Sequence, residues 1–156
     1  FSGETTVVAP GINAKMSEIQ AAMGLLQLKY IDKNIYKRHE ITQYYGEWLN
    51  KISGIKLLND IPNVKHNYSY LPIFVDVDKY GISRDELYEN LKEHNTYTRR
   101  YFYPLISQFP TYRGLESAQP GKLPVAEKAA DQVICLPLYP ELQANTIDSI
   151  CSFIKK

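Results

Sequence analysis

Apolar side chains recur at helical spacing in the first third of the chain. Ser17 and Gln20 stand three residues apart, which is the capping-box pattern of a helix N-terminus. No proline interrupts residues 17–52, and Gly54 provides a stop signal. The pattern predicts one long helix, or two helices that meet near residues 31–34. The apolar positions at spacings of three and four are Ile19, Ala22, Met23, Leu26 and Tyr30, then Ile41, Tyr45, Trp48, Leu49 and Ile52.

A strand pattern follows at residues 68–77, where β-branched and aromatic side chains dominate the sequence YSYLPIFVDV. Pro72 has no backbone N–H, so we expect this strand to lie at a sheet edge or to contain a bulge. Residues 78–81, DKYG, are typical of a turn that ends the strand.

Local signals predict further elements. Ser83 and Glu86 form a second capping box, and Pro124 stands where the missing N–H of a first helical turn costs nothing. Asn145 or Thr146 is expected to cap the last helix. In chain order we predict a short helix after Ser83, a strand or extended loop at residues 96–105, a loop at 107–121, a helix at 124–132, a short apolar strand at 133–140 and a final helix that runs to residue 154.

These elements indicate one α+β domain, residues 1–156, in which a long N-terminal helix and further helices pack on a small, mainly antiparallel sheet. We find no repeat, low-complexity tract or linker. The predicted core consists of Ile73, Val75, Leu87, Leu91, Ile134, Leu136, Ile150 and Ile154.

Composition narrows the function only a little. The 156 residues carry a net charge of +1, without the global basicity expected of a protein that binds nucleic acid. No apolar run approaches the ~20 residues of a membrane span. Two cysteines are too few for a disulfide framework, so we expect a reducing cytoplasm. The chain opens on Phe1, and we expect it to be a piece of a longer protein.

Two stretches carry candidate chemistry. Asn13 and Lys15 precede a helix start, where an amide and a cation can complement a phosphate, although Asn is also an ordinary turn residue. Two arginines are followed by three aromatic residues in the run 99–103, RRYFY, which can clamp a phosphate and pack a ring on a sugar or base. The alternative for this run is an amphipathic strand with exposed arginines and buried aromatics. The three histidines have no metal-ligand spacing, so we predict no metal site. No Gly-rich phosphate loop or nucleophile motif occurs either.

The ordered set of motifs resembles the C-terminal part of the DegT/StrS-type sugar aminotransferases, which are fold-type I enzymes dependent on pyridoxal phosphate (PLP). The resemblance extends over essentially the whole chain. Its motifs are GINAKMSEIQAAMGLLQLKYID, GISRDELYENLKEH, RRYFYPL, PTYRG, LPVAEKAADQVICLPLYP and IDSICSFI.

The resemblance implies roles for five residues. Asn13 corresponds to the family asparagine that reaches the PLP phosphate of the partner subunit, and Lys15 replaces the usual arginine, keeping its charge without its bidentate fork. Arg100, Tyr101 and Tyr103 fall in a segment near the sugar-nucleotide substrate. Ile106 and Ser107 stand where relatives often have a histidine, so a histidine contact to substrate is not expected.

The resemblance also implies what must come from elsewhere. In this family an N-terminal domain supplies the Schiff-base lysine, the carboxylate on the pyridine nitrogen and the aromatic residue stacked on the ring. We therefore assign no catalytic residue here and expect the chain alone to be inactive. The parent would be a homodimer that moves an amino group, usually from glutamate, to a ketone on a nucleotide-linked deoxy sugar. The alternative is a non-catalytic dimerising or sugar-nucleotide-binding module derived from that fold.

Overall fold

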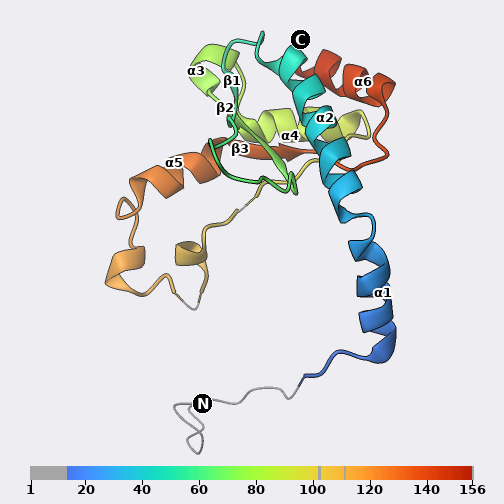
Figure 1. Cartoon of the computed structure of the whole chain (residues 1–156). Helices are drawn as coiled ribbons and strands as arrows, with labels where there is room; N and C mark the ends of the chain where they lie inside the picture. Colours follow the sequence, from blue (N-terminus) through green and yellow to red (C-terminus); the bar gives the residue numbers. More distant parts are fainter. Residues whose placement is uncertain (1–13, 102, 111, 156) are drawn as a thin grey trace, which may run out of the picture. The chain divides into compact units, whose positions relative to one another are not determined.

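The computed structural model describes residues 14–101, 103–110 and 112–155. Figure 1 labels its helices and strands. The chain divides into two compact units, with the boundary between Asp32 and Lys33. Asn13, for which a cofactor contact is predicted, lies outside the described residues.

The first unit contains helix α1 (Glu18–Leu28), which begins at the predicted capping box. The backbone N–H of Gln20 donates to Oγ of Ser17 at 3.3 Å, and the N–H of Ser17 donates to Oε1 of Gln20 at 2.9 Å. These two bonds satisfy donors that a helix start otherwise leaves unpaired. No residue of α1 is buried, and its exposed apolar side chains include Met23, Leu25, Leu26 and Leu28.

The second unit begins within α2 (Ile31–Leu49). Two helices are therefore present, and the break between them falls at residues 29–30, just before the predicted junction. In α2 the buried residues Ile41, Tyr45 and Leu49 stand four apart, which places them on one face of the helix.

Three antiparallel strands form the sheet, in the order β1 (Ile55–Leu57), β2 (Leu71–Val75) and β3 (Val133–Leu136). Ile73 at the centre of β2 stands opposite Leu57 on one side and Ile134 on the other. This small antiparallel sheet with its helices confirms the α+β prediction. The three-residue strand β1 was not predicted, because it is too short to show an alternating pattern.

The prediction that Pro72 marks an edge strand or a bulge was wrong, since β2 is the central strand. Pro72 stands opposite Cys135, whose N–H and C=O both bond to Arg99 on the far side of β3, at 2.7 and 3.1 Å. The Pro72 nitrogen therefore faces β1, whose pairing stops one residue earlier, at Leu57 opposite Ile73. No ladder hydrogen bond is lost, so the central strand tolerates a proline.

Both ends of the predicted strand at residues 68–77 are trimmed. Tyr68 has a φ of 48°, which is incompatible with extended backbone. The predicted turn is instead a single helical turn, α3 (Val77–Tyr80), which Gly81 ends with a φ of 94°. The later strand predicted at 133–140 stops at Leu136, before a proline.

The remaining helices lie close to their predicted positions. Helix α4 (Arg84–Glu93) starts at the second capping box, and α5 (Pro124–Gln132) starts at its proline. The stretch predicted as loop contains two single 3₁₀ turns, η1 (Ile106–Gln108) and η2 (Glu116–Ala118).

The predicted cap of the last helix was wrong. Helix α6 (Ala144–Ile154) has Gln143 as its N-cap, not Asn145 or Thr146. The Gln143 carbonyl accepts from the N–H groups of Thr146 and Ile147, so the N-cap lies two to three residues before the predicted caps.

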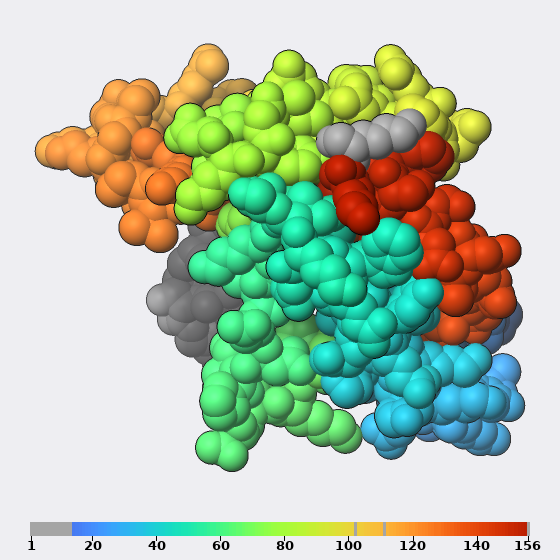
Figure 2. Space-filling view, turned by 90° about the horizontal axis from the view of Figure 1, so that it is seen from above, coloured from blue at the N-terminus to red at the C-terminus, as the bar shows by residue number. Residues whose placement is uncertain are grey.

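All eight predicted core residues are buried, and they form one cluster with residues of α2. Figures 1 and 2 show α6 beside α2, where the hydroxyl of Tyr44 donates to Asp148 at 2.7 Å. Within the described ranges, no helix is long and apolar enough to cross a membrane.

Candidate substrate-binding site

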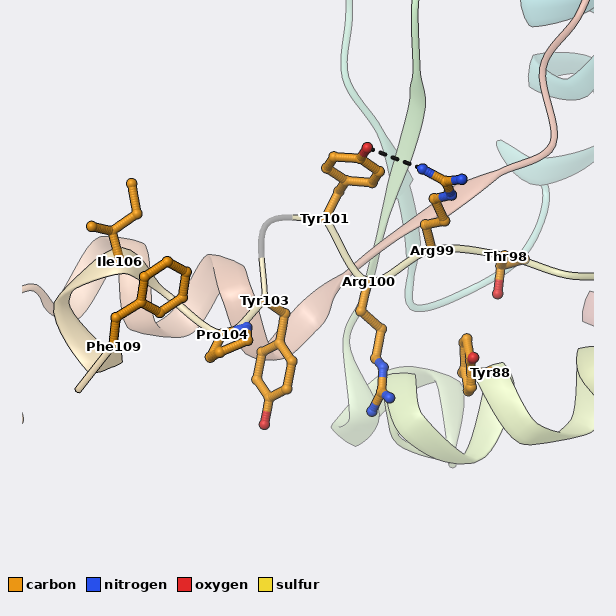
Figure 3. Close-up of a pocket in the computed structure, with 9 residues that line it drawn as sticks. All are labelled: Tyr88, Thr98, Arg99, Arg100, Tyr101, Tyr103, Pro104, Ile106 and Phe109. Atoms are coloured by element: carbon orange, nitrogen blue, oxygen red, sulfur yellow. Dashed lines mark hydrogen bonds between the residues drawn. The ribbon is translucent and has the colours of Figure 1, made fainter. Parts of the chain in front are cut away.

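A pocket of about 420 Å³ opens between α4, the segment 98–104 and the turn η1. Figure 3 draws the side chains around it. Aromatic rings and two arginines dominate this lining, with a few apolar groups at one end. The lining residues are Tyr88, Thr98, Arg99, Arg100, Tyr101, Tyr103, Pro104, Ile106 and Phe109.

The segment 98–104 is held beside the sheet by its backbone. The N–H of Arg99 donates to the carbonyl of Cys135, and the N–H of Cys135 donates to the carbonyl of Arg99. Arg99 therefore pairs with β3 on the side away from β2. Successive side chains of extended backbone point to opposite sides. Figure 3 accordingly shows Arg99 and Tyr101 on one side of the segment and Arg100 on the other. The alternation does not continue after the turn at Tyr101, because Tyr103 lies on the same side as Arg100.

Arg100 is framed by aromatic rings and one carboxylate. Its guanidinium carbon lies 4.6 Å from the ring centre of Tyr88 and 5.6 Å from that of Tyr103. One of its terminal nitrogens donates to Oδ1 of Asp85 at 3.0 Å. The side chain remains 36% exposed, so its other N–H groups can meet a ligand in the pocket. A planar cation between rings suits a phosphate joined to a sugar or base.

Tyr101 belongs to a second cluster on the opposite side of the segment. Arg99 donates to its hydroxyl at 3.2 Å, and its ring lies 4.7 Å from the ring of Tyr70. The hydrogen bond with Tyr70, and then the one from Arg99, lowers the pKa of Tyr101, while the bond to Tyr101 raises the pKa of Tyr70. Tyr101 is among the residues that line the pocket, but its side chain lies on the Arg99 side of the segment and its hydroxyl accepts from Arg99.

A buried arginine, Arg84, packs behind the Tyr103 side of the pocket. Arg84 is 3% exposed, and one of its terminal nitrogens donates to the carbonyls of Ala130 and Val133 at 2.8 and 2.9 Å. Its Nε donates to Oδ1 of Asp85 at 2.8 Å, and its guanidinium lies 4.8 Å from the Tyr103 ring. Arg84 thus ties the start of α4 to the end of α5 and supports one wall of the pocket.

The three predicted substrate residues, Arg100, Tyr101 and Tyr103, all line this one pocket. The alternative of buried aromatics under exposed arginines does not describe the segment, because Tyr103 is 45% exposed and Arg100 is half-buried. Sequence reasoning missed Arg84, Asp85, Tyr70 and Tyr88. The Arg-Asp pair directly after the Ser83 cap was a visible signal, but its partner Arg100 lies 15 residues away.

The predicted cofactor residues are placed only in part. Lys15 is exposed, two residues before the N-cap of α1, and makes no hydrogen bond or ion pair with the described residues. A cation beside the positive end of a helix fits one oxygen of a PLP phosphate. It offers nothing to the pyridine ring, so the fit of the described residues to PLP is confined to the phosphate.

Comparison with known proteins defines the class. Residues 2–155 match the DegT/DnrJ/EryC1/StrS aminotransferase family, and the chain belongs to this family. The dTDP-4-amino-4,6-dideoxy-D-glucose transaminase of Escherichia coli is 48% identical over 154 residues, covering 99% of this chain and 41% of that protein. The protein of the same name from Shigella dysenteriae is 38% identical over 156 residues, covering 100% of this chain and 42% of its own length.

A solved structure has a similar fold over most of this chain. The crystal structure of DesI in the presence of its TDP-sugar product superposes with a TM-score of 0.84 at 32% identity, over 93% of this chain and 36% of that one. The chain thus spans about two-fifths of the length of the curated relatives it matches.

Proposed function

We propose that this chain is the C-terminal, substrate-binding part of a PLP-dependent aminotransferase that acts on a nucleotide-linked keto-deoxy sugar. The carrying observation is Arg100, a partly exposed side chain whose guanidinium is framed by Tyr88 and Tyr103 in a pocket of about 420 Å³. The two relatives above are transaminases whose names specify a dTDP-linked 4-amino-4,6-dideoxy sugar. The matching acceptor would be the 4-keto-6-deoxy sugar on the same nucleotide.

The residues of this chain then bind and orient the substrate. Arg100 donates to the diphosphate, because its fork of N–H groups matches anionic oxygens. Tyr103 packs its ring on the sugar or base and excludes water from that side. Tyr101 contributes to the lining of the pocket, while its hydroxyl stays bonded to Arg99.

The cofactor and the catalytic groups come from outside the described residues. PLP supplies the electron sink for the transfer of the amino group, with glutamate as the donor. Lys15, and Asn13 by family resemblance, contact the PLP phosphate of a homodimer partner. The missing N-terminal domain supplies the lysine that bonds PLP, so the chain alone is inactive. Two free, buried cysteines suit the reducing cytoplasm in which we place the enzyme.

Steady-state kinetics of the full-length protein test the pocket. Arg100→Gln removes the cation and should raise KM for the nucleotide sugar about tenfold to a hundredfold, as loss of a charge-assisted hydrogen bond does. KM for glutamate should stay unchanged. Arg113→Gln is the matched control, because Arg113 is an exposed arginine outside the pocket lining. Equal KM values for the nucleotide sugar in the two variants would refute the assignment of this pocket. A protein that binds the nucleotide sugar without transaminating it would instead be the non-catalytic module.

A further inference from the structure

Asp85 lies between a buried arginine, Arg84, and a partly exposed one, Arg100. The same carboxylate oxygen accepts from Nε of Arg84 at 2.8 Å and from a terminal nitrogen of Arg100 at 3.0 Å. The side chain of Arg84 is 2% exposed and is fixed by two backbone carbonyls at the end of α5. The carboxylate is therefore bonded to a cation that cannot move without breaking buried hydrogen bonds.

Arg100 has no such anchor of its own. Within the described residues, its guanidinium makes its hydrogen bond only to Asp85, and its remaining contacts are with the faces of Tyr88 and Tyr103. A long side chain that is one-third exposed loses substantial rotamer freedom when it is held in a single orientation. Because the bond to Asp85 already restricts the Arg100 side chain in the free protein, less conformational entropy is lost when a ligand binds.

We infer that Asp85 is a positioning residue for substrate binding. With Arg84 as its fixed support, it holds the Arg100 guanidinium so that the unused N–H groups face the diphosphate of the nucleotide sugar. Figure 3 shows the Arg100 side chain extending from the segment 98–104 on the same side as Tyr103, near Tyr88. The inference rests on the proposed function, because the diphosphate is the ligand that this function requires.

A positioning role and a simple charge-compensating role for Asp85 predict opposite changes in nucleotide affinity when Asp85 is replaced by asparagine. Removal of a negative charge 3.0 Å from Arg100 would by itself strengthen anion binding. Asparagine keeps an amide oxygen as acceptor but loses the charge that strengthens the bond to Arg100, and this weaker hold on the guanidinium weakens anion binding. The sign of the change in affinity therefore separates a positioning carboxylate from one that merely competes with the substrate.

The test is calorimetric titration of the full-length protein with dTDP. Asp85→Asn should raise Kd about tenfold, the scale of one charge-assisted hydrogen bond. Glu89→Gln is the control: it makes the same change on the same helix, where Glu89 is 60% exposed and paired with Lys92 at 3.4 Å. It should leave Kd within about twofold of the wild type. In an Arg100→Gln background, Asp85→Asn should have no further effect.

Tighter or unchanged dTDP binding by Asp85→Asn, or the same loss in both Arg100 backgrounds, would overturn the inference. The crystal structure of the full-length Asp85→Asn protein without nucleotide gives a separate answer. The positioning role requires that Arg100 leaves its place between the two tyrosine rings, and it is refuted if the guanidinium stays there. Failure of the wild type to bind dTDP would instead overturn the proposed function, and these crystals would still decide whether Asp85 holds Arg100.

Discussion

Replacing Arg84 by methionine should destabilise the domain strongly, although Arg84 is only the first residue of α4. The side chain is 2% exposed and donates to Ala130, Val133 and Asp85. Methionine fills a similar volume but donates nothing. Two carbonyls of residues that are themselves buried, at the end of α5 and the start of β3, would then lack their partner.

The magnitude follows from those contacts. Each hydrogen bond from a charged donor contributes about 1.5–3 kcal/mol, and removing one partner of a buried ionic group costs about 3–5 kcal/mol. Water can reach part of the exposed Asp85 carboxylate, so we expect a loss near the lower end, about 3 kcal/mol. With a urea m-value of about 1.5 kcal/mol/M, the midpoint should fall by about 2 M.

The assay is urea unfolding of the 156-residue chain followed by circular dichroism, with Arg113→Met beside Arg84→Met. Arg113 is exposed and its side chain has no hydrogen bond with the described residues, so its loss should change stability by less than about 0.5 kcal/mol. A loss of stability below about 1 kcal/mol for Arg84→Met would contradict the role of Arg84 as an anchor, since that is no more than an average point substitution costs.

Two further predictions concern titratable groups. Burial raises the pKa of the Cys135 thiol to about 11 and that of Cys151 to about 12. Neither thiol should therefore react with a disulfide reagent near neutral pH until urea unfolds the chain. Fast reaction of both thiols in the native protein would contradict their burial. Hydrogen bonds from the side chain and backbone of Ser83 lower the pKa of Glu86, so its contribution to stability is present above the ordinary glutamate pKa and is lost as pH falls through the lowered one. Ser83→Ala should therefore make stability fall less steeply with acid, in urea titrations between about pH 5 and 3, and an unchanged slope would show that this bond does not set the pKa.

Local signals in the sequence were enough for the elements that local chemistry defines. The Ser17 and Ser83 capping boxes and the first-turn Pro124 identify helix starts, because their hydrogen bonds or missing donor act within one turn. The core was predictable for the same reason, since periodicity selects one face of each helix and strand. The start of α6 was not, because its N-cap, Gln143, makes no side-chain capping hydrogen bond and is not one of the usual capping residue types.

What could not be predicted depends on pairing between distant segments. Pro72 is tolerated in a central strand only because its nitrogen faces the side where β1 has ended. Motif resemblance identified three of the residues that line the candidate pocket, Arg100, Tyr101 and Tyr103. The bond from Arg100 to Asp85, and the support of Asp85 by Arg84, join the segment 98–104 to α4 and α5 through contacts that leave no periodic signal.

The most direct test of the proposed function is transfer of nitrogen by the full-length protein. Purified enzyme with PLP is incubated with dTDP-4-keto-6-deoxy-D-glucose and glutamate that carries an isotope-labelled amino group, and the sugar nucleotide is recovered for mass spectrometry. We expect the label to appear in a dTDP-linked amino sugar, with formation slowed by Arg100→Gln and unaffected by Arg113→Gln at limiting substrate. Absence of label from every sugar nucleotide offered, with dTDP- and UDP-linked ketones both tested, would contradict the assignment of this chain to a sugar aminotransferase.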